Sequence, residues 1–188
     1  MAKKGIRYAV FATRTETESG TSISVTYSGG KNISPVVTFN GSINSSNTKD
    51  YGDDVVQEVD NSVTGGTISI ELNNDEDDIY TMLLGHSKAD SSASNAGEIT
   101  FAETDVAPFI GVGAIGKSGS KWVGKWYPKV QFKEPNDDNA TRQETVTFGH
   151  ITIEGEILIP YDGVWKTRKE FSSFSDAKTW LNTKASIS

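Results

Sequence analysis

A glycine-rich stretch near the middle of the chain, GVGAIGKSG at Gly111–Gly119, has the spacing of two nucleotide-binding motifs. From Gly111 it fits the G-x-G-x-x-G of dinucleotide-binding proteins and, through Lys117, the G-x-x-x-x-G-K-[ST] of phosphate-binding P-loops. Each motif needs a helix directly after the loop, because the N–H groups of that helix hold the phosphates. The following SGSKWVGKWYPKVQF alternates as a strand instead. We therefore predict a glycine-lined strand with a hairpin turn at Gly116–Gly119, and no bound nucleotide.

Other residues that could carry chemistry lack the spacing that such chemistry needs. The acidic run Asn73–Asp78 has Asp78 and Leu84 where a calcium-binding EF-hand loop needs Gly and Glu. His86 and His150 lie in no metal-ligand spacing and accompany no nucleophile-elbow sequence. The absence of Cys excludes thiol nucleophiles and thiolate zinc sites. We expect no catalytic residue, no metal site and no cofactor, and hence no enzyme.

The length and charge of the chain favour a single acidic domain. Its 188 residues, 1–188, suit one domain with its own core, and its formal net charge is −7. Proteins that grip nucleic acid are usually basic, because affinity comes from neutralising phosphates, so tight DNA binding is not expected. The N-terminal MAKKGIRYAVFA is too short and too broken for a signal peptide or a membrane span, and we expect no membrane partner.

Most of the chain alternates between apolar and polar residues with the period of β-strands. In the first half the alternating apolar residues are Ile6, Tyr8 and Val10; Ile23, Val25 and Tyr27; Val37, Phe39 and Ile43; and Ile68, Ile70 and Leu72. The later segment Lys121–Lys133 is predicted to place four residues on one face, namely Trp122, Trp126, Val130 and Phe132. The run Arg142–Ile159 changes phase at Gly149-His150, which predicts a β-bulge.

Three long polar segments interrupt these strands. Ser42–Asp54 is flanked by strands on both sides, so we predict that it is the tip of an extended hairpin arm. His86–Glu98 and Glu134–Glu144 lack apolar periodicity and are predicted to be long loops.

Two short helices are predicted beside the strands. The first would be capped by Asn73 or Asn74, with the acidic Asp75–Asp78 in its first turn and Gly85 as its stop. The second would begin with a capping box at Ser173. The predicted fold is mainly β: two packed antiparallel sheets, as a β-sandwich or partial barrel, with one or two short flanking α-helices and a long loop or hairpin arm.

The tryptophans leave two classes of function open. Trp122 and Trp126 share their predicted face with apolar residues, which favours burial in a core or against another subunit. The same pair could instead offer a platform to a sugar ring. A monomeric β-sandwich carbohydrate-binding module is therefore the alternative to a structural protein.

The second half of the chain resembles the major tail proteins, or tail tube proteins, of long-tailed bacteriophages, of the phi13 or TP901-1 type. The segments that carry the resemblance are APFIGVGAIG, KWVGKWYPKVQFKEP, ATRQETVTFGHITIEGEI and DGVWKTRKEFSSFSDAKTWL. The opening KKGIRYAVFA also fits the first strand of that family. The similarity spans nearly the whole chain and is densest from Ala107 to Leu181.

The resemblance implies a structural protein that assembles with itself. Such proteins form hexameric rings that stack into the tube through which DNA is ejected, and strands of six subunits close into one barrel. It implies tape measure, tail terminator and distal tail proteins as further partners, and passage of DNA without specific binding. It places the protein in the virion, as part of the phage tail assembled in the host bacterial cytoplasm. Some relatives carry a C-terminal immunoglobulin-like domain, which we do not expect here.

On this interpretation, residues of the predicted arm and of the glycine-rich stretch are candidates for contacts between subunits. The arm would become ordered on assembly, and glycines let another backbone or subunit approach closely. Lys117 is expected to be either a solvated turn residue or a contact between rings. The candidates are Asn47, Asp50, Tyr51, Asp53, Gly111, Gly113 and Lys117.

Overall fold

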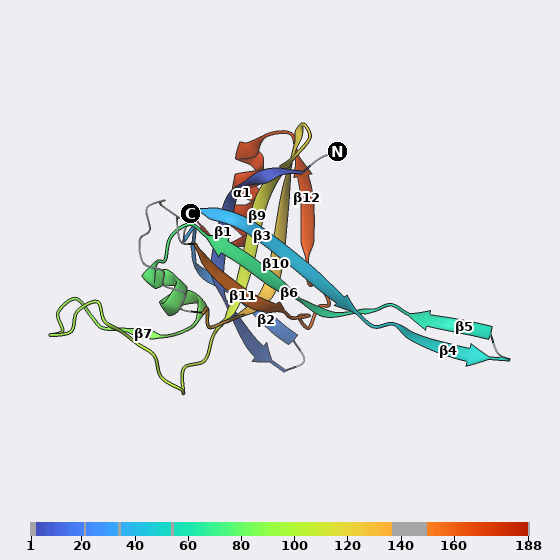
Figure 1. The fold of residues 1–188 in the computed structure, drawn as a ribbon, viewed down its shortest axis with the longest axis horizontal. Coiled ribbons are helices and arrows are strands. Elements are labelled where there is room, and N and C mark those ends of the chain that lie inside the picture. The colour runs from blue at the N-terminus through green and yellow to red at the C-terminus, as the bar shows by residue number, and fades with distance from the viewer. Residues whose placement is uncertain (1–2, 21, 34, 54, 137–149, 188) are drawn as a thin grey trace, which may run out of the picture.

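A computed structural model describes residues 3–20, 22–33, 35–53, 55–136 and 150–187 (Figure 1). Within these residues the structure is mainly β, as predicted. The strands of the large sheet are β1 (Lys3–Ser19), β2 (Ser22–Lys31), β3 (Val36–Ser45), β6 (Val63–Leu72), β9 (Phe109–Ser118), β10 (Lys121–Lys133), β11 (Ile151–Ile157) and β12 (Thr167–Phe171). The remaining elements are β4 (Thr48–Gly52), β5 (Val55–Asp60), β7 (Ser87–Lys88), β8 (Ile99–Thr100), the π-helical turn η1 (Ile79–Leu83) and the helix α1 (Phe174–Lys184).

The large sheet is antiparallel, and its strands follow the order β2-β1-β9-β10-β11-β6-β3. Strand β10 belongs to two layers, because its first half pairs with β12, from Trp122 opposite Phe171, and its second half pairs with β11, from Val130 opposite Ile157. The sheet curls, so that β3 returns close to β1 (Figure 1). The predicted β-sandwich or partial barrel is therefore confirmed, with one continuous sheet supplying both layers.

The larger core lies between the two layers. Along β6 the alternating residues Ile68, Ile70 and Leu72 are fully buried, as the sequence predicted. Burying each such side chain stabilises the fold by about 1.5–3 kcal/mol. The other buried members of this core are Phe11, Ile33, Ile79, Leu83, Leu84, Ile110, Val112, Tyr127, Val130, Phe132, Ile153 and Ile157.

A smaller core lies on the outer face of the sheet, beneath α1. The predicted N-cap of this helix is confirmed, because the Asp176 N–H donates to the Ser173 hydroxyl. Ala177 and Leu181 form the buried face of the helix. They pack against four sheet residues and the residue that follows the helix, namely Val10, Ala12, Ile115, Trp126 and Ala185.

A register shift in β10 separates residues that the sequence placed on one face. The pairing of β10 with β9 is interrupted between Tyr127 and Val130. Trp122 and Trp126 therefore pack with the core beneath α1, whereas Val130 and Phe132 pack in the core between the layers. The prediction of one continuous apolar face was wrong, because a bulge turns the side chains that follow it to the other side of the strand.

The predicted short helix is confirmed in part: Asp77 and Asp78 are helical and continue into η1, but Asp75 and Glu76 lie before the helix, and neither Asn73 nor Asn74 caps it. The π-helical turn begins after Asp78, and no side chain caps it. The carboxylates instead reach cations on other elements, since Asp77 pairs with Lys88 and Asp78 with Lys31, each at 2.6 Å. The predicted stop is confirmed at Gly85, whose φ of +83° favours glycine.

Part of the predicted run Arg142–Ile159 lies outside the described residues. This part includes Gly149, so the predicted bulge there stays a prediction. The described part, β11, buries Ile153 and Ile157 in the expected phase. Ile159 is 40% exposed, because it lies beyond the end of the strand.

Of the two predicted polar loops, the structure describes one in full and the other only in part. Most of Glu134–Glu144 lies outside the described residues. The segment His86–Glu98 is not irregular throughout, because it contains β7, which pairs with β8 in a small hairpin.

The predicted hairpin arm is confirmed. Beyond a break at residues 46–47, β3 is followed by β4, which pairs with β5 from Thr48 opposite Asp60 to Gly52 opposite Val55. This two-stranded ribbon projects far from the body (Figure 1). At its tip Asp53 has a φ of +51°, the left-handed conformation that two-residue hairpin turns require.

Candidate interaction surfaces

The glycine-rich stretch forms β9 and is enclosed by residues of its own chain. A methyl group added at Gly111 would lie 2.5 Å from the Trp126 ring, and one added at Gly113 would lie 2.5 Å from Leu181 Cδ1. The strand leads into β10 and not into a helix, so neither nucleotide-binding motif has the structure it needs. The glycines do permit a close approach, but the approaching groups are intramolecular. The expectation that Gly111 and Gly113 contact another subunit stays a prediction.

Lys117 lies in the strand and not in the turn. Strand β9 continues to Ser118 and the turn is formed by Gly119-Ser120, so the predicted turn at Gly116–Gly119 began too early in the sequence. The Lys117 ammonium group lies 5.3 Å from the centroid of the Trp122 ring. Lys117 is exposed, and its contact between copies stays a prediction.

The arm of β4 and β5 exposes apolar side chains as well as charged ones. Tyr51 is 63% exposed, Val55 60% and Val59 43%. An isolated two-stranded hairpin is marginally stable in water, so an arm of this kind is suited to contact with another surface. All four residues that the sequence singled out here are exposed: Asn47, Asp50, Tyr51 and Asp53.

Two acidic side chains lie directly opposite each other on the arm. Asp50 of β4 pairs with Glu58 of β5, so both carboxylates project from the same face of the ribbon. Like charges in this position are destabilising. The ion pairs found among the described residues include neither carboxylate. The arm therefore presents a concentrated negative charge.

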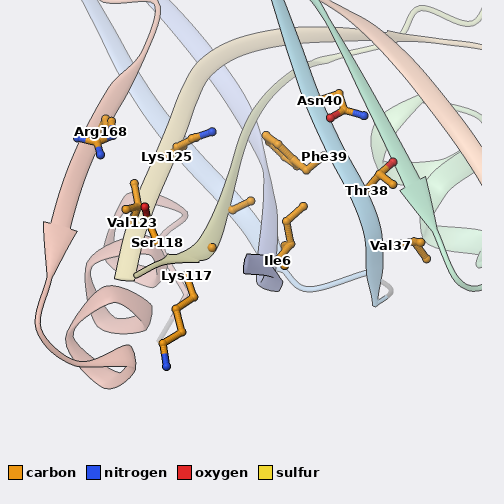
Figure 2. A pocket seen from close by; sticks show the side chains of 13 residues that line it. Ile6, Val37, Thr38, Phe39, Asn40, Lys117, Ser118, Val123, Lys125 and Arg168 are labelled. Carbon is orange, nitrogen blue, oxygen red and sulfur yellow. The ribbon is translucent and has the colours of Figure 1, made fainter. Parts of the chain in front are cut away.

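A pocket of about 330 Å³ lies near the start of β3, at the other end of that strand from the arm (Figure 2). It separates β3 from the layer formed by β1, β9, β10 and β12, and its apolar lining includes Ile6, Phe39 and Val123. Among the described strands, β3 pairs only with β6, and the first residues of β1 pair only with β9. Two strand edges therefore face each other across the pocket.

Two basic side chains lie directly opposite each other beside this pocket. Lys125 of β10 pairs with Arg168 of β12, and Figure 2 shows Lys125 reaching toward β3, while Lys117 points away. Arg168 donates to Glu170 at 2.6 Å, and Lys121 lies 3.4 Å from the other oxygen of that carboxylate. The hydrogen bond from Arg168 lowers the pKa of Glu170. Glu170 thus pairs with two cations, Arg168 and Lys121, and Lys125 lies opposite Arg168 on the neighbouring strand.

A partly buried histidine joins distant segments near η1, and sequence reasoning missed this cluster. His86 Nδ1 lies 2.8 Å from Asp105 Oδ2, and His86 Nε2 lies 3.0 Å from Glu134 Oε2. Burial lowers the pKa of His86, but hydrogen bonds to the two carboxylates outweigh burial and raise the pKa above its usual value. A ring that donates from both nitrogens has no lone pair for catalysis. The cluster is therefore suited to holding segments together.

Buried Arg14 secures the bulge in β10 and was also missed by sequence reasoning. Its Nη1 donates to the Pro128 carbonyl at 3.2 Å and to the Tyr27 hydroxyl at 2.8 Å, and Tyr27 itself donates to the same carbonyl at 3.0 Å. Its Nε lies 2.8 Å from Glu16, which also binds Lys129 at 2.9 Å. An arginine ending an apolar run was the only sequence signal.

The two tryptophans of β10 do not form an exposed platform. Trp126 is 2% exposed and packs edge-on against Tyr27, with ring centroids 5.2 Å apart. Trp122 is partly buried, and its ring centroid lies 5.0 Å from that of Phe174. Both rings serve the packing of α1 and β2 on the sheet.

Comparison of the chain with protein-family models finds no matching model, and comparison with curated proteins finds no significant match. Within the described residues no group of three or more histidine or acidic side chains is placed to hold a metal ion. The helices in the described part of the chain are too short or too polar to cross a membrane. Proposals about function therefore depend on the surfaces described above.

Proposed function

We propose that the protein is a structural subunit of a bacteriophage tail tube, which assembles with further copies of itself into stacked hexameric rings. The observation that carries this proposal is the arm, which exposes Tyr51, Val55 and Val59 far from the body. Contact with another copy would cover these side chains and supply the layer that a two-stranded hairpin needs. The sequence resemblance to tail tube proteins supports the same function.

The edges and the charge of the subunit also support an assembled tube. Strands β2 and β3 end the large sheet among the described strands. Pairing such edges between subunits would remove them from solvent and close a continuous barrel. An acidic wall repels phosphates, so DNA would pass without specific binding. Tape measure, tail terminator and distal tail proteins would contact such a tube in the virion, after assembly in the host bacterial cytoplasm.

Electron microscopy of the purified protein tests this function directly. We expect rings with six-fold symmetry and stacked tubes at high protein concentration, and sedimentation velocity should show the corresponding oligomers. A protein that remains monomeric at all concentrations and ionic strengths, including in the presence of other tail proteins, would contradict the proposal.

The carbohydrate-binding alternative makes a different demand on the same protein. It needs an aromatic surface open to a sugar ring, whereas Trp126 is 2% exposed. A glycan array combined with sedimentation would separate the two functions. Saturable sugar binding by a monomer would favour the alternative.

A further inference from the structure

We propose that a basic surface around Arg7 and Lys117 receives the acidic arm of a second copy. This inference rests on the proposed function, because it specifies one contact through which the subunits would assemble. The surface, called here the basic end, lies where the start of β1, the turn between β9 and β10, β12 and α1 meet, uppermost in Figure 1. In the sequence it consists of residues 3–12, 114–124 and 167–184.

The charges of the chain are strongly separated between the basic end and the rest. The basic end contains nine lysines and arginines and only two acidic residues, a net charge of +7. The rest of the chain therefore has a net charge of −14, which together give the −7 of the whole. The arm, residues 48–60, contains five acidic residues and one lysine, a net charge of −4. Such complementary surfaces steer association and suppress wrong partners.

Two cations of the basic end are held on aromatic rings. The Arg7 guanidinium lies 5.4 Å from the centroid of the Trp122 ring and 4.5 Å from that of Phe174, and the Lys117 ammonium lies 5.3 Å from the Trp122 centroid. Both cations are exposed, and Figure 2 shows Lys117 directed away from the pocket. A ring positions a cation without neutralising its charge.

Neither of these cations has a carboxylate partner in the described part of the chain, since no ion pair found there includes Arg7 or Lys117. Other cations of the basic end differ, because Lys121 and Arg168 already pair with Glu170 and are not assigned to this contact. Two cations that are positioned but not paired suit an anion that arrives from outside, because little side-chain freedom remains to be lost on binding.

The arm offers two carboxylates in a matching arrangement. Asp50 and Glu58 lie directly opposite each other on β4 and β5, and the repulsion between them destabilises the isolated arm. Both lie in no ion pair among the described residues. Placing them against Arg7 and Lys117 would relieve this repulsion and would pair two cations that are exposed in the single subunit.

The arm projects away from the basic end of its own chain. Strand β3 begins beside the basic end, because Val37 lines the same pocket as Lys117, and the arm follows the far end of this strand (Figure 1). At about 3.3 Å per residue, the extended ribbon places Asp50 roughly 40 Å from Val37. The contact therefore joins two copies head-to-tail, and such a contact closes into a ring or continues as a tube.

Charge reversal of each partner in the full-length protein tests the contact. One variant carries Arg7→Glu with Lys117→Glu, and the other carries Asp50→Lys with Glu58→Lys. We expect each variant alone to assemble at least about tenfold less than wild type, as measured by sedimentation velocity and electron microscopy. An equimolar mixture should assemble again, because reversed arms then meet reversed basic ends and unchanged arms meet unchanged ones.

A matched control is Lys133→Glu with Lys166→Glu, which gives the same change in net charge outside the basic end. Lys166 also lies over an aromatic ring, 5.2 Å from the centroid of Tyr127, and Lys133 is in an exposed ion pair. This control should assemble like wild type. Circular dichroism with thermal melting should show that the variants are folded, and Arg7→Gln with Lys117→Gln repeats the test if the glutamates impair folding.

The outcomes separate this contact from the proposed function. If wild type forms tubes and both reversed variants do so equally well, the basic end does not receive the arm, although the tail tube function stands. If wild type forms oligomers other than rings or tubes, and these are lost in each reversed variant and return in the mixture, the contact stands and the tail tube function fails.

Nucleic acid is the other polyanion that a basic surface with aromatic rings would attract. If wild type retards a DNA fragment on a gel, the Arg7→Glu and Lys117→Glu variant does not, and self-assembly is the same in both, the basic end serves DNA and the contact with the arm is overturned.

Discussion

The hairpin of β9 and β10 is covered on both of its faces, whereas the hairpin of β4 and β5 is exposed on both. The first has the core between the layers on one side and α1 on the other. The second carries exposed side chains at all the positions that the structure describes. Two antiparallel hairpins of the same kind thus differ in place: β9–β10 lies in the middle of the fold, and β4–β5 projects from it.

This difference shows which feature decides the role of a hairpin. Small residues in β9, such as Gly111 and Gly113, allow a tryptophan and a helix to pack closely, and this produces a tight intramolecular contact. The arm instead carries the opposed acids Asp50 and Glu58, and its apolar side chains, such as Tyr51 and Val55, are exposed. Changes in the β9–β10 hairpin should therefore alter folding, whereas changes in the arm should alter association.

The largest effect is expected from Arg14→Met. The change removes the guanidinium that binds the Pro128 carbonyl, Tyr27 and Glu16, and it leaves a partly buried carboxylate with one partner fewer. Breaking a buried ion pair by removing one partner costs about 3–5 kcal/mol, and because Glu16 keeps Lys129 we expect a loss near the lower end of this range in urea unfolding. Lys133→Met removes an exposed ion pair and serves as the control, with little expected change. Equal effects of the two changes would show that the bulge does not need Arg14.

A smaller loss is expected from Gly113→Ala in β9. The added methyl would lie 2.5 Å from Leu181 Cδ1 and 2.7 Å from the Lys125 carbonyl oxygen. Overpacking of this kind costs about 1–3 kcal/mol, measurable as a lower midpoint of thermal unfolding. Gly116→Ala on the same strand is the matched control, because its new methyl meets nothing closer than 3.4 Å. If both variants melt together, β9 has more room than the structure indicates.

The His86 cluster should make stability depend on pH. Since the pKa of His86 is raised above 6.5, its contribution to the free energy of unfolding is complete below that pH and is lost as pH rises through the folded-state pKa. Asp105, whose pKa is lowered mainly by the bond to His86, stays ionised over the same range. Wild type should therefore exceed His86→Gln in stability at pH 5.5 by more than at pH 8.5. The same substitution at His150 is the control, and an equal pH profile for both would contradict this role.

The smallest effect on folding is expected in the arm. Tyr51→Ser and Val59→Ser change exposed side chains, so the free energy of unfolding of the monomer should stay within about 0.5 kcal/mol of wild type. Self-assembly should nevertheless fall, as measured by sedimentation velocity under conditions where wild type forms oligomers. A loss of monomer stability comparable to that of Gly113→Ala would show that the arm belongs to the folded core.

Much of the architecture could be predicted from local patterns. The alternation of Ile68, Ile70 and Leu72 identified a half-buried strand, and Ser173 identified the start of α1. Each of these signals involves only residues a few positions apart in the sequence. The polar segment Ser42–Asp54 likewise indicated an arm. The face of Trp122 and Val130 was misassigned because a bulge inserts residues without any clear local signal.

The candidate surfaces were less accessible to sequence reasoning. The arm could be named, but its opposed Asp50 and Glu58 depend on a register that only pairing fixes. The pocket brings Lys125 beside Arg168, 43 positions away, and no local pattern links them. The contact of His86 with Asp105 and Glu134 likewise joins residues far apart in the sequence, so no local pattern predicts it.

By itself the sequence determined that this chain would be a β-rich, acidic protein without a thiol or a nucleotide loop, since periodicity, composition and the residues after Lys117 are local properties. Only the tertiary structure decided that Gly111 and Gly113 of β9 face side chains of their own chain, and that like charges meet across β4–β5 and across β10–β12. The reason is physical: curling of the sheet and strand register bring together residues far apart in the chain, and neither is encoded by any short segment.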